Sequence, residues 1–542
     1  MHEAAYLLAA FALCSQLLAL IRDRLFAAHF GASHTLDLYY AGFRIPDFLF
    51  ATVASLLSLY ALLPVLTRLE QKGDGLVVAF LEQTLIFFFV CMGAISLVVC
   101  IFAPQIIALV MPGIHDPSLV LLVRILLLQP ILLGASNIVA AFTQLRQRFF
   151  LYSISPLLYN FGIILGTLTF YPYMGVAGLG WGVVLGALLH FLIQLPFFGA
   201  KEEGKWLPLS ELFRELTSVL RLSVPRTLAL AATQVSLLLI VGIASLLSAG
   251  SISVFMFAYN LQAVPLTIIG VSYSVAAFPT LARLHAQGSH AEFVRYIETA
   301  LRHIFFWSIP ATVFVIVLRA QLVRVILGAG AFDWAATRLT AAALALFIVS
   351  LAAQSVTLLI ARAYYAAGNT RKPLYFGLVD IVVSVGSALC FAFAFHDYAF
   401  IRIFIESLLR VGDVPGTVVL MLALGYCCGS VAEFVVGLFF FMRDFKIPRI
   451  RISALIFQSF SASVIGGAAS YMVLLYTGIA GTVNTTWMLV LQGAAAGVVG
   501  VCVVLGILVL LRNEELKEAV GALHRRFRDR GGVALETTDI SS

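Results

Sequence analysis

Long apolar segments alternate with short polar connections along almost the whole chain. A helix that spans a bilayer needs about 20 predominantly apolar residues. Fourteen segments approach that length, at 4–26, 36–64, 76–111, 118–145, 150–171, 175–199, 218–246, 251–282, 297–327, 336–363, 373–396, 412–441, 453–477 and 485–511. Proline and glycine inside 76–111 and 251–282 predict bends there. The pattern therefore predicts an all-α polytopic membrane protein with about fourteen transmembrane helices.

The composition supports this class. Of 542 residues, 61% are hydrophobic and 11% are charged, whereas soluble domains carry about 25% charged residues. The first apolar run, at 4–20, lacks a basic segment before it and a small-residue cleavage site after it, so we expect a spanning helix rather than a cleaved signal peptide. All seven cysteines lie inside apolar runs, which predicts small buried hydrophobic side chains rather than disulfides or metal ligands.

Basic residues are concentrated in alternate connections. The loops after even-numbered predicted helices carry Lys and Arg at 68–72, 146–148, 201–221, 283–302, 371–372 and 443–451. The loops after odd-numbered helices are nearly bare, apart from the Arg22–Arg24 cluster, Arg402 and Arg410. The positive-inside rule therefore predicts that both termini are cytoplasmic. The net charge of +7 is a signal of topology and not of nucleic-acid binding.

A motif recurs at a nearly constant offset. LPVLTRL at 63–69 returns as FPTLARL at 278–284, and Pro-Leu at 156–157 returns at 373–374, which gives offsets of 215 and 217 residues. The repeat predicts two six-helix bundles that cross the membrane in the same direction. Proteins built from such repeats bind substrate between the two halves, which favours a transporter over an inert scaffold. The predicted domains are a bundle at 1–199, a cytoplasmic linker at 200–217, a bundle at 218–441, helices 13 and 14 at 442–511, and a cytoplasmic tail at 512–542.

The first two apolar segments contain six ionisable residues: Arg22, Asp23, Arg24, Asp37, Arg44 and Asp47. Each would cost at least ~2.5–3.5 kcal/mol at the centre of a spanning helix, so such groups usually face an aqueous cavity and carry a function. The alternative is that Arg22 and Arg24 lie at the helix end and extend to the membrane interface.

The sequence lacks the common catalytic and nucleotide-binding motifs. It contains no GxxxxGK[ST], HExxH, CxxC or GxSxG. We therefore expect no cofactor and no metal site, and the coupling cation, if one is used, is left open. An enzyme acting on polyprenyl-linked sugars would normally have a long extracytoplasmic loop, and the longest here, 397–411, is predicted to be an interfacial helix. A cation-coupled drug exporter would need carboxylates deep in the first bundle, where Asp37 is the main candidate.

The stretch FGASHTLDLYYAGFRIPDFL at 30–49 resembles the opening motif of the MurJ/MviN family, the lipid II flippases of the multidrug/oligosaccharidyl-lipid/polysaccharide exporter superfamily. The likeness continues in the same order at 111–114, 122–160, 178–196, 248–272 and 362–373. It implies two bundles around a central cavity, with helices 13 and 14 forming a groove for a lipid tail. It also implies movement of undecaprenyl-pyrophosphate-linked disaccharide-pentapeptide to the outer leaflet of the bacterial inner membrane, for peptidoglycan synthesis.

The resemblance assigns candidate substrate-binding residues. Arg22 and Asp23 match the end of the family's Ser-Arg-x-x-Gly-x-x-Arg-Asp motif, Asp37 matches the aspartate of its Thr-Asp-x-Phe segment, and Arg44 matches the basic residue before Ile-Pro. Arg24 is a further cation of the same cluster. Arginine suits a pyrophosphate head because its planar fork binds phosphate oxygens bidentately.

Three arginines of the family pattern are absent. Gln16, Phe50 and Asn260 occupy their positions, and Ala19 replaces a glycine of the first motif. Our hypothesis is that Arg22 and Asp37 line the central cavity, with Arg22 on the anionic head. A second hypothesis is that Gln16 and Asn260 face the same cavity from opposite halves.

The reduced set of cations leaves two interpretations. In one, the chain is a lipid II flippase for which Arg22, Arg24 and Arg44 suffice. In the other, it exports a different lipid-linked or amphiphilic substrate, or it has a non-transporting role in a cell-wall complex. The expected partners are the lipid-linked precursor, membrane lipids and cell-wall synthesis proteins, and not nucleic acid.

Overall fold

The structure is a computed structural model that describes residues 2–57, 59–195, 206–447, 452–479, 486–518 and 520–521. The regular elements within these residues are all helices, which confirms the predicted fold class. Parts of the predicted linker (200–205) and of the predicted tail (522–542) lie outside the described residues.

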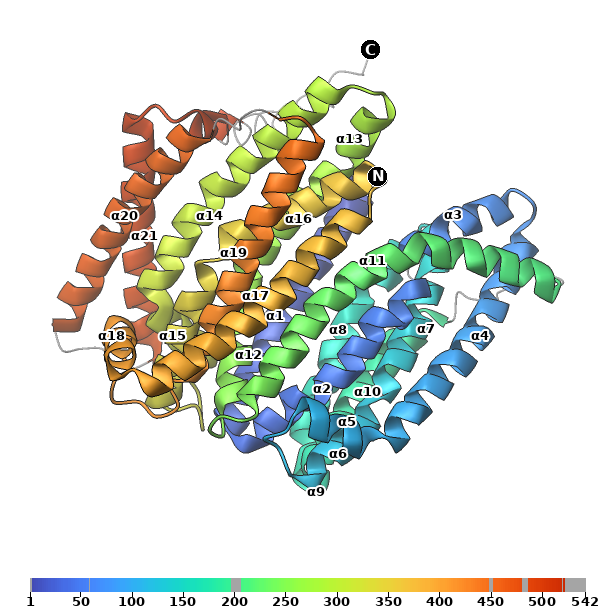
Figure 1. The fold of residues 1–542 in the computed structure, drawn as a ribbon, viewed down its shortest axis with the longest axis horizontal. Helices are drawn as coiled ribbons and strands as arrows, with labels where there is room; N and C mark the ends of the chain where they lie inside the picture. Colours follow the sequence, from blue (N-terminus) through green and yellow to red (C-terminus); the bar gives the residue numbers. More distant parts are fainter. Residues whose placement is uncertain are drawn as a thin grey trace, which may run out of the picture. The chain divides into compact units, whose positions relative to one another are not determined.

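Figure 1 shows the helices in the order of the chain. The first half contains α1 (His2–Phe30), α2 (His34–Thr52), η1 (Ala54–Leu57), α3 (Leu59–Glu70), α4 (Asp74–Ile101), α5 (Ala103–Val110), α6 (Pro117–Leu126), α7 (Leu128–Leu145), α8 (Phe149–Leu165), η2 (Gly166–Phe170), α9 (Tyr171–Met174) and α10 (Val176–Leu192). The second half contains α11 (Leu209–Ala244), α12 (Ser251–Leu266), η4 (Thr267–Val271), α13 (Ser272–Ala286), α14 (His290–Leu327), α15 (Trp334–Ile348), α16 (Leu351–Ala366), α17 (Arg371–Asp397), α18 (Ala399–Leu409), α19 (Val419–Asp444), α20 (Ser453–Ile479) and α21 (Thr486–Leu510).

The described helices include many that can cross a membrane. Ten are long and apolar enough, and two bent pairs raise the number to as many as twelve. The bent pairs are α2 with η1 and α3, and α15 with α16. The other two predicted spans fall on α1, which carries the Arg22–Arg24 cluster, and on α10, which has 17 residues. The chain is a multi-pass membrane protein, and the count of fourteen stays a prediction.

The chain divides into two compact units. Unit 1 comprises residues 1–261, 326–347 and 369–436, and unit 2 comprises 262–325, 348–368 and 437–542. Unit 1 thus joins the whole predicted first bundle to parts of the second. The predicted bundle boundaries follow the internal repeat and stay a prediction. The residues proposed for the site all belong to unit 1.

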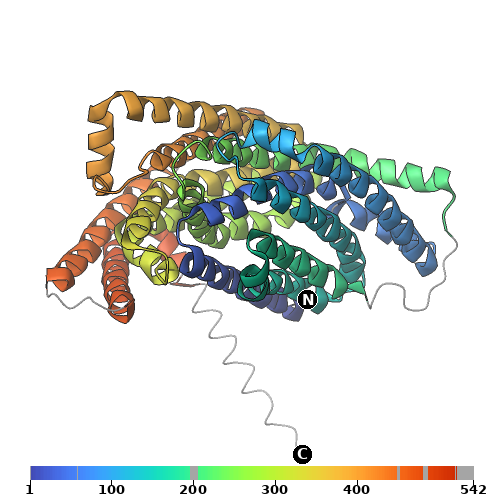
Figure 2. The ribbon, with the colours of Figure 1, turned by 90° about the horizontal axis from the view of Figure 1, so that it is seen from below.

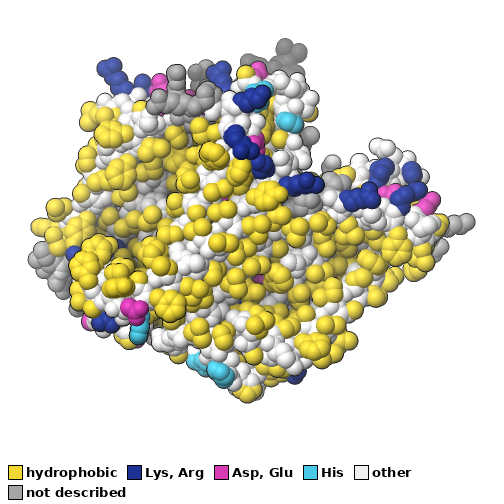
Figure 3. All heavy atoms as spheres, viewed as in Figure 1, with side chains coloured by type: hydrophobic (Ala, Val, Ile, Leu, Met, Phe, Trp, Pro, Cys, Tyr) yellow, Lys and Arg dark blue, Asp and Glu magenta, His cyan; other side chains and the backbone are white. Residues whose placement is uncertain are grey.

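The helices carry large hydrophobic side chains on their outer faces. Leu109 is 82% exposed, Val90 66% and Phe393 67%, and Figure 3 shows hydrophobic side chains over most of the face in view. All seven cysteines lie in described residues, and none forms a disulfide there. The prediction that they are buried is wrong for Cys14, Cys390 and Cys502, which are exposed because their helix positions face outward.

Glycines allow two helices of unit 1 to touch along their backbones. α8 and α10 are in close contact. Gly162 of α8 faces Gly186 of α10, and Gly166, the first residue of η2, faces Gly182 of α10. A Cβ atom on Gly182 would lie 2.4 Å from the Cα atom of Gly166. Membrane helices associate by van der Waals packing rather than by the hydrophobic effect, so small residues at such contacts stabilise the fold.

The α-helix is interrupted in both segments for which a bend was predicted. α4 ends at Ile101 and α5 starts at Ala103, next to Pro104. In the other apolar run, α12 carries Pro265 and is followed by the π-helical segment η4 before α13 begins. Proline removes a backbone donor and crowds the preceding turn, which accounts for both interruptions.

The stretch predicted to be an interfacial helix forms α18. Figure 2 shows α18 turned across the end of α17. The following loop is held by Arg338, which donates to both oxygens of Asp413 at 2.6 Å. α11 already starts at Leu209, directly after Pro208 and inside the predicted linker, and the linker boundaries stay a prediction.

A glycine substitution tests the α8–α10 contact. Gly182→Ala adds one methyl group against the Gly166 backbone, and overpacking of this kind costs about 1–3 kcal/mol. We expect a lower midpoint of thermal unfolding for the purified protein in detergent. Gly93→Ala is the matched control, because a Cβ atom there has no neighbour within 4 Å. Equal midpoints for the two variants would contradict the contact.

Candidate functional site

An ion pair between neighbouring residues on α1 forms the centre of the candidate site. Arg22 donates through NH2 to Asp23 Oδ1 at 2.8 Å and through Nε to the same oxygen at 3.1 Å. The Asp23 side chain is 5% exposed and that of Arg22 19%. Arg22 also donates through NH1 to Asn160 Oδ1 on α8 at 3.0 Å. The guanidinium is thereby held between a carboxylate and an amide, on the side of α1 that faces α8.

The second oxygen of Asp23 binds a residue far away in the sequence. Asn260 of α12 donates through Nδ2 to Asp23 Oδ2 at 3.1 Å. The structure thus brings together Arg22, Asp23 and Asn260, three of the predicted site residues. Asn260 takes the place of an arginine of the family pattern and provides a neutral donor, so Arg22 and Asp23 form a pair with no net charge.

A second polar network lies on α2. Arg44 is 7% exposed and donates to the Tyr40 carbonyl at 3.2 Å and to Asp47 Oδ2 at 3.4 Å. Gln129 of α7 donates to the other oxygen of Asp47 at 3.5 Å and to the Tyr159 hydroxyl at 3.3 Å. Arg44 is therefore also held as part of a locally neutral group.

Asp37 caps the start of α12. Its Oδ2 accepts from the Gly250 N–H at 2.6 Å, and its Oδ1 accepts from the Ser253 N–H at 2.7 Å and the Ser253 hydroxyl at 2.6 Å. The Asp37 residue is 5% exposed. A carboxylate at a helix N-terminus pairs with free N–H groups and with the positive end of the helix dipole. Asp37 is thus a structural link between α2 and α12.

Three glycine turns interlock beside this link. Gly31, Gly250 and Gly330 have φ values of 61°, 90° and 53°. A Cβ atom on Gly31 would lie 2.5 Å from the Ala331 carbonyl oxygen, and one on Gly330 would lie 2.2 Å from the Ala28 carbonyl oxygen. These turns join α1 to α2, α11 to α12, and α14 to α15. Together with Asp37 they close one end of unit 1.

The other two candidates have different surroundings. Arg24 donates through NH1 to the Ile326 carbonyl at 3.2 Å, in the last turn of α14, where a cation interacts favourably with the helix dipole. Gln16 is half-buried on α1, two turns before Arg22. Neither side chain has a described bond to the Arg22–Asp23 pair, so their assignment to the substrate site stays a prediction.

Sequence reasoning missed several polar residues that the structure brings forward. Asn160 binds Arg22, and Ser253 binds Asp37. Asp380 of α17 is 6% exposed and accepts from the Ser384 hydroxyl at 3.0 Å. A lone Asn or Asp inside an apolar run was the signal that could have identified Asn160 and Asp380.

The arrangement can bind an anion by exchange of partners. An arginine that pairs with a carboxylate can instead bind a phosphate, because both present oxygens that fit its fork. Asn160 would still accept a hydrogen bond from Arg22, and Asn260 would remain as a neutral donor. Among the described residues, no group of three His, Cys, Asp or Glu side chains could hold a metal ion.

Comparison with known proteins gives one consistent result. The family model described as "Lipid II flippase MurJ" matches residues 26–492. The lipid II flippase MurJ of Burkholderia cenocepacia is 25% identical over 386 residues, which cover 69% of this chain and 75% of that protein. The probable lipid II flippase MurJ of Haemophilus influenzae is 27% identical over 406 residues, covering 69% and 78%.

Solved structures show the same fold. A structure titled "Lipid II flippase MurJ, inward closed conformation" has a TM-score of 0.73 at 20% identity and covers 94% of this chain and 99% of its own. An inward-facing multidrug resistance transporter of the MATE family in the MOP superfamily has a TM-score of 0.64 at 14% identity, covering 80% and 94%.

Two capping aspartates allow a test of the Asp37 link. Asp37→Ala leaves buried N–H groups without an acceptor and should lower the free energy of unfolding by about 3 kcal/mol. Asp116 is the control, because it caps α6 through the Ser118 N–H at 2.8 Å but is partly exposed. Asp116→Ala should cost about 1 kcal/mol. Thermal unfolding in detergent measures the loss of stability of each variant. A smaller loss for Asp37→Ala than for Asp116→Ala would contradict the buried link between α2 and α12.

The Asp116 cap should also weaken in acid. The hydrogen bond from the Ser118 N–H holds the pKa of the Asp116 carboxyl below its usual range. A lowered pKa in the folded state means that the cap stabilises the protein above about pH 4, and that this contribution is lost as the pH falls through the folded pKa. The stability difference between the native protein and Asp116→Asn should therefore shrink below about pH 4. A stability difference between the two proteins that does not change with pH would contradict this role of the ionised Asp116 carboxylate.

Proposed function

The chain belongs to the lipid II flippase MurJ family, and we propose that it moves lipid II from the inner to the outer leaflet of the bacterial inner membrane. The observation that carries the proposal is the Arg22 guanidinium, held on α1, a predicted spanning helix, by Asp23, Asn160 and, through Asp23, by Asn260. In this proposal the chain is a membrane transporter and not an enzyme. Its substrate is the undecaprenyl-pyrophosphate-linked disaccharide-pentapeptide.

The chemistry of the substrate explains why such a site is needed. A pyrophosphate cannot enter hydrocarbon without partners, since an isolated charge there is very costly. Arg22 provides two adjacent N–H groups for phosphate oxygens once it leaves Asp23. The resting ion pair with Asp23 keeps the empty site neutral, which lowers the cost of a cation among apolar helices.

Alternating access also needs an end of the cavity that opens and closes. The bonds from Gly250 and Ser253 to Asp37, together with the interlocked turns at Gly31 and Gly330, hold one end of unit 1 closed. We propose that this end is the outer one and that these bonds break when the substrate leaves. The placement of both termini in the cytoplasm follows from the positive-inside rule.

The proposal needs no resident cofactor. A coupling cation, the membrane potential or the gradient of the substrate itself would supply the energy, and cell-wall synthesis proteins are the proposed protein partners. The experiments below distinguish lipid II transport from export of another lipid-linked or amphiphilic substrate and from a non-transporting role in a cell-wall complex.

Complementation in a bacterium tests the proposed function. The chain is expressed in cells whose own lipid II flippase can be shut off, its membrane level is measured, and survival and outer-leaflet lipid II are scored. We expect rescue by the native chain and loss of rescue, by at least about tenfold in surviving cells, for Arg22→Gln, because one charged hydrogen-bonding partner is worth about 1.5–3 kcal/mol.

The matched control is Arg338→Gln. Arg338 is also an arginine bonded to an aspartate, Asp413, but it lies in a partly exposed pair away from Arg22. This variant should rescue like the native chain. Failure of the native chain at normal membrane levels would overturn the lipid II assignment and favour another substrate or a scaffold role.

A pair of substitutions at Asn260 tests the electrostatics of the site. Asn260→Arg adds a cation beside Asp23 and frees Arg22, so binding of lipid II to the purified protein should tighten by about tenfold. Asn260→Asp adds a second carboxylate there and should weaken binding by a similar factor. Equal affinities for the two variants would show that the anionic head does not bind near Asp23.

A further inference from the structure

α11 is longer than a membrane span requires. It has 36 residues from Leu209 to Ala244, which corresponds to about 54 Å at 1.5 Å per residue, against about 30 Å of bilayer hydrocarbon. Its apolar window covers only Thr227–Ala244. The first half of α11, residues 209–226, therefore extends beyond the span.

One face of this first half is anchored to unit 1. Leu212, Leu216 and Val219 are buried, at the spacing of one helix face. On the same face, Glu215 accepts from Arg68 NH2 of α3 at 2.7 Å. The packing and the ion pair hold the extension in a defined position against α3.

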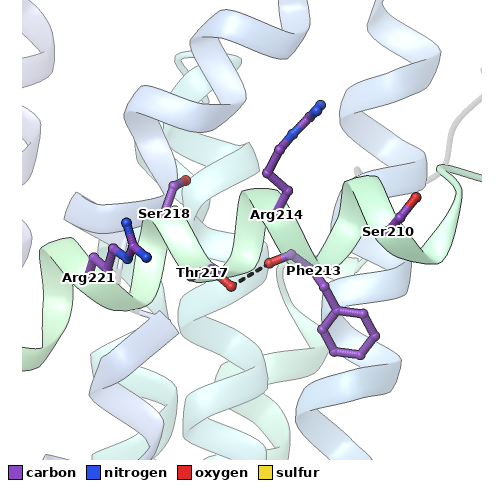
Figure 4. Close-up of a pocket in the computed structure, with 6 residues that line it drawn as sticks. All are labelled: Ser210, Phe213, Arg214, Thr217, Ser218 and Arg221. Atoms are coloured by element: carbon purple, nitrogen blue, oxygen red, sulfur yellow. Dashed lines mark hydrogen bonds between the residues drawn. The ribbon is translucent and has the colours of Figure 1, made fainter.

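The opposite face carries a basic groove. A pocket of about 670 Å³ is lined by Ser210, Phe213, Arg214, Thr217, Ser218 and Arg221. Figure 4 shows Ser210, Arg214 and Ser218 on one side of the helix and the Phe213 ring on the other. In Figure 3, Lys and Arg side chains gather over this part of α11 and the adjacent α3, at the right of the view.

Both arginines of the groove are available for an anion. Arg214 and Arg221 are exposed, and neither has an ion pair or hydrogen bond from its side chain to another described residue. Glu215, the carboxylate next to Arg214 in the sequence, binds Arg68 instead. Ser210, one turn before Arg214, adds an exposed hydroxyl that can donate to an anion, whereas the Ser218 hydroxyl already donates to the Glu215 carbonyl at 2.7 Å.

The border of the groove is apolar. Leu209 is 68% exposed, Phe213 51% and Val224 41%, and Trp206 before the helix is 60% exposed. Arginine beside exposed aromatic and aliphatic side chains is typical of a helix that lies at the boundary between headgroups and acyl chains. A soluble anion would not need this apolar border.

We propose that the groove formed by Ser210, Arg214, Ser218 and Arg221 binds the phosphate of an anionic phospholipid headgroup. The two guanidinium groups contact the phosphate oxygens, and the acyl chains lie along Phe213 and Val224 towards the apolar part of α11. Basic pockets beside spanning helices bind lipid headgroups by this chemistry. The site is separate from Arg22 and holds a membrane lipid in place without moving it.

The test is lipid binding by the purified full-length protein. Native mass spectrometry counts the phosphatidylglycerol and phosphatidylcholine molecules that stay bound as each lipid is titrated. We expect the native protein to prefer phosphatidylglycerol and the double variant Arg214→Gln, Arg221→Gln to bind it about tenfold more weakly. Arg214→Lys, Arg221→Lys keeps the charge and should retain most of the binding, which separates a lost site from a misfolded protein.

The matched control is the double variant Arg283→Gln, Arg295→Gln. It removes the same charge from two exposed arginines elsewhere and should bind like the native protein. Equal binding of phosphatidylglycerol by the native and Arg214→Gln, Arg221→Gln proteins would overturn the proposal. Displacement of the lipid by inorganic phosphate at matched concentration would also overturn it, because the ligand would then be a soluble anion. None of these readouts depends on lipid II transport.

Discussion

The bonds between Asp37 and the start of α12 are the constraint on which the closed end of unit 1 depends. One buried carboxylate satisfies three donors on Gly250 and Ser253, and it does so across 213 to 216 residues of sequence. The glycine turns at Gly31, Gly250 and Gly330 can approach so closely only because they lack a Cβ atom. A charge inside a membrane protein is here a structural link between helices, at an end where transport would require an opening.

The Arg22–Asp23 pair shows how a chain with fewer arginines can hold a guanidinium group among apolar helices. The carboxylate neutralises the guanidinium, Asn160 accepts from Arg22, and Asn260 donates to the second oxygen of Asp23. Breaking the pair for a phosphate exchanges one charged partner for another and does not create a bare charge. Asn260 therefore has a defined role at a position where the family pattern has an arginine.

Much of the fold could be predicted from hydrophobic periodicity, because each spanning helix needs a long apolar run of its own. The helix predicted at 397–411 is present, and the α-helix is interrupted within 76–111 and 251–282, where bends were predicted. The start of α11 was missed because its polar residues resemble a linker. At the site, the charged residues of α1 and α2 were identifiable by their cost in a membrane. Their partners Asn160 and Ser253 were not, since such contacts depend on how distant helices pack.

Translocation in proteoliposomes tests the central claim most directly. The purified chain is reconstituted, and the appearance of fluorescent lipid II in the opposite leaflet is compared with that of an uncharged polyprenyl-linked disaccharide. We predict that the native chain moves lipid II and not the uncharged lipid, and that Arg22→Gln moves neither. Movement of both lipids by the native chain, or of lipid II by Arg22→Gln at the native rate, would contradict recognition of the pyrophosphate by Arg22.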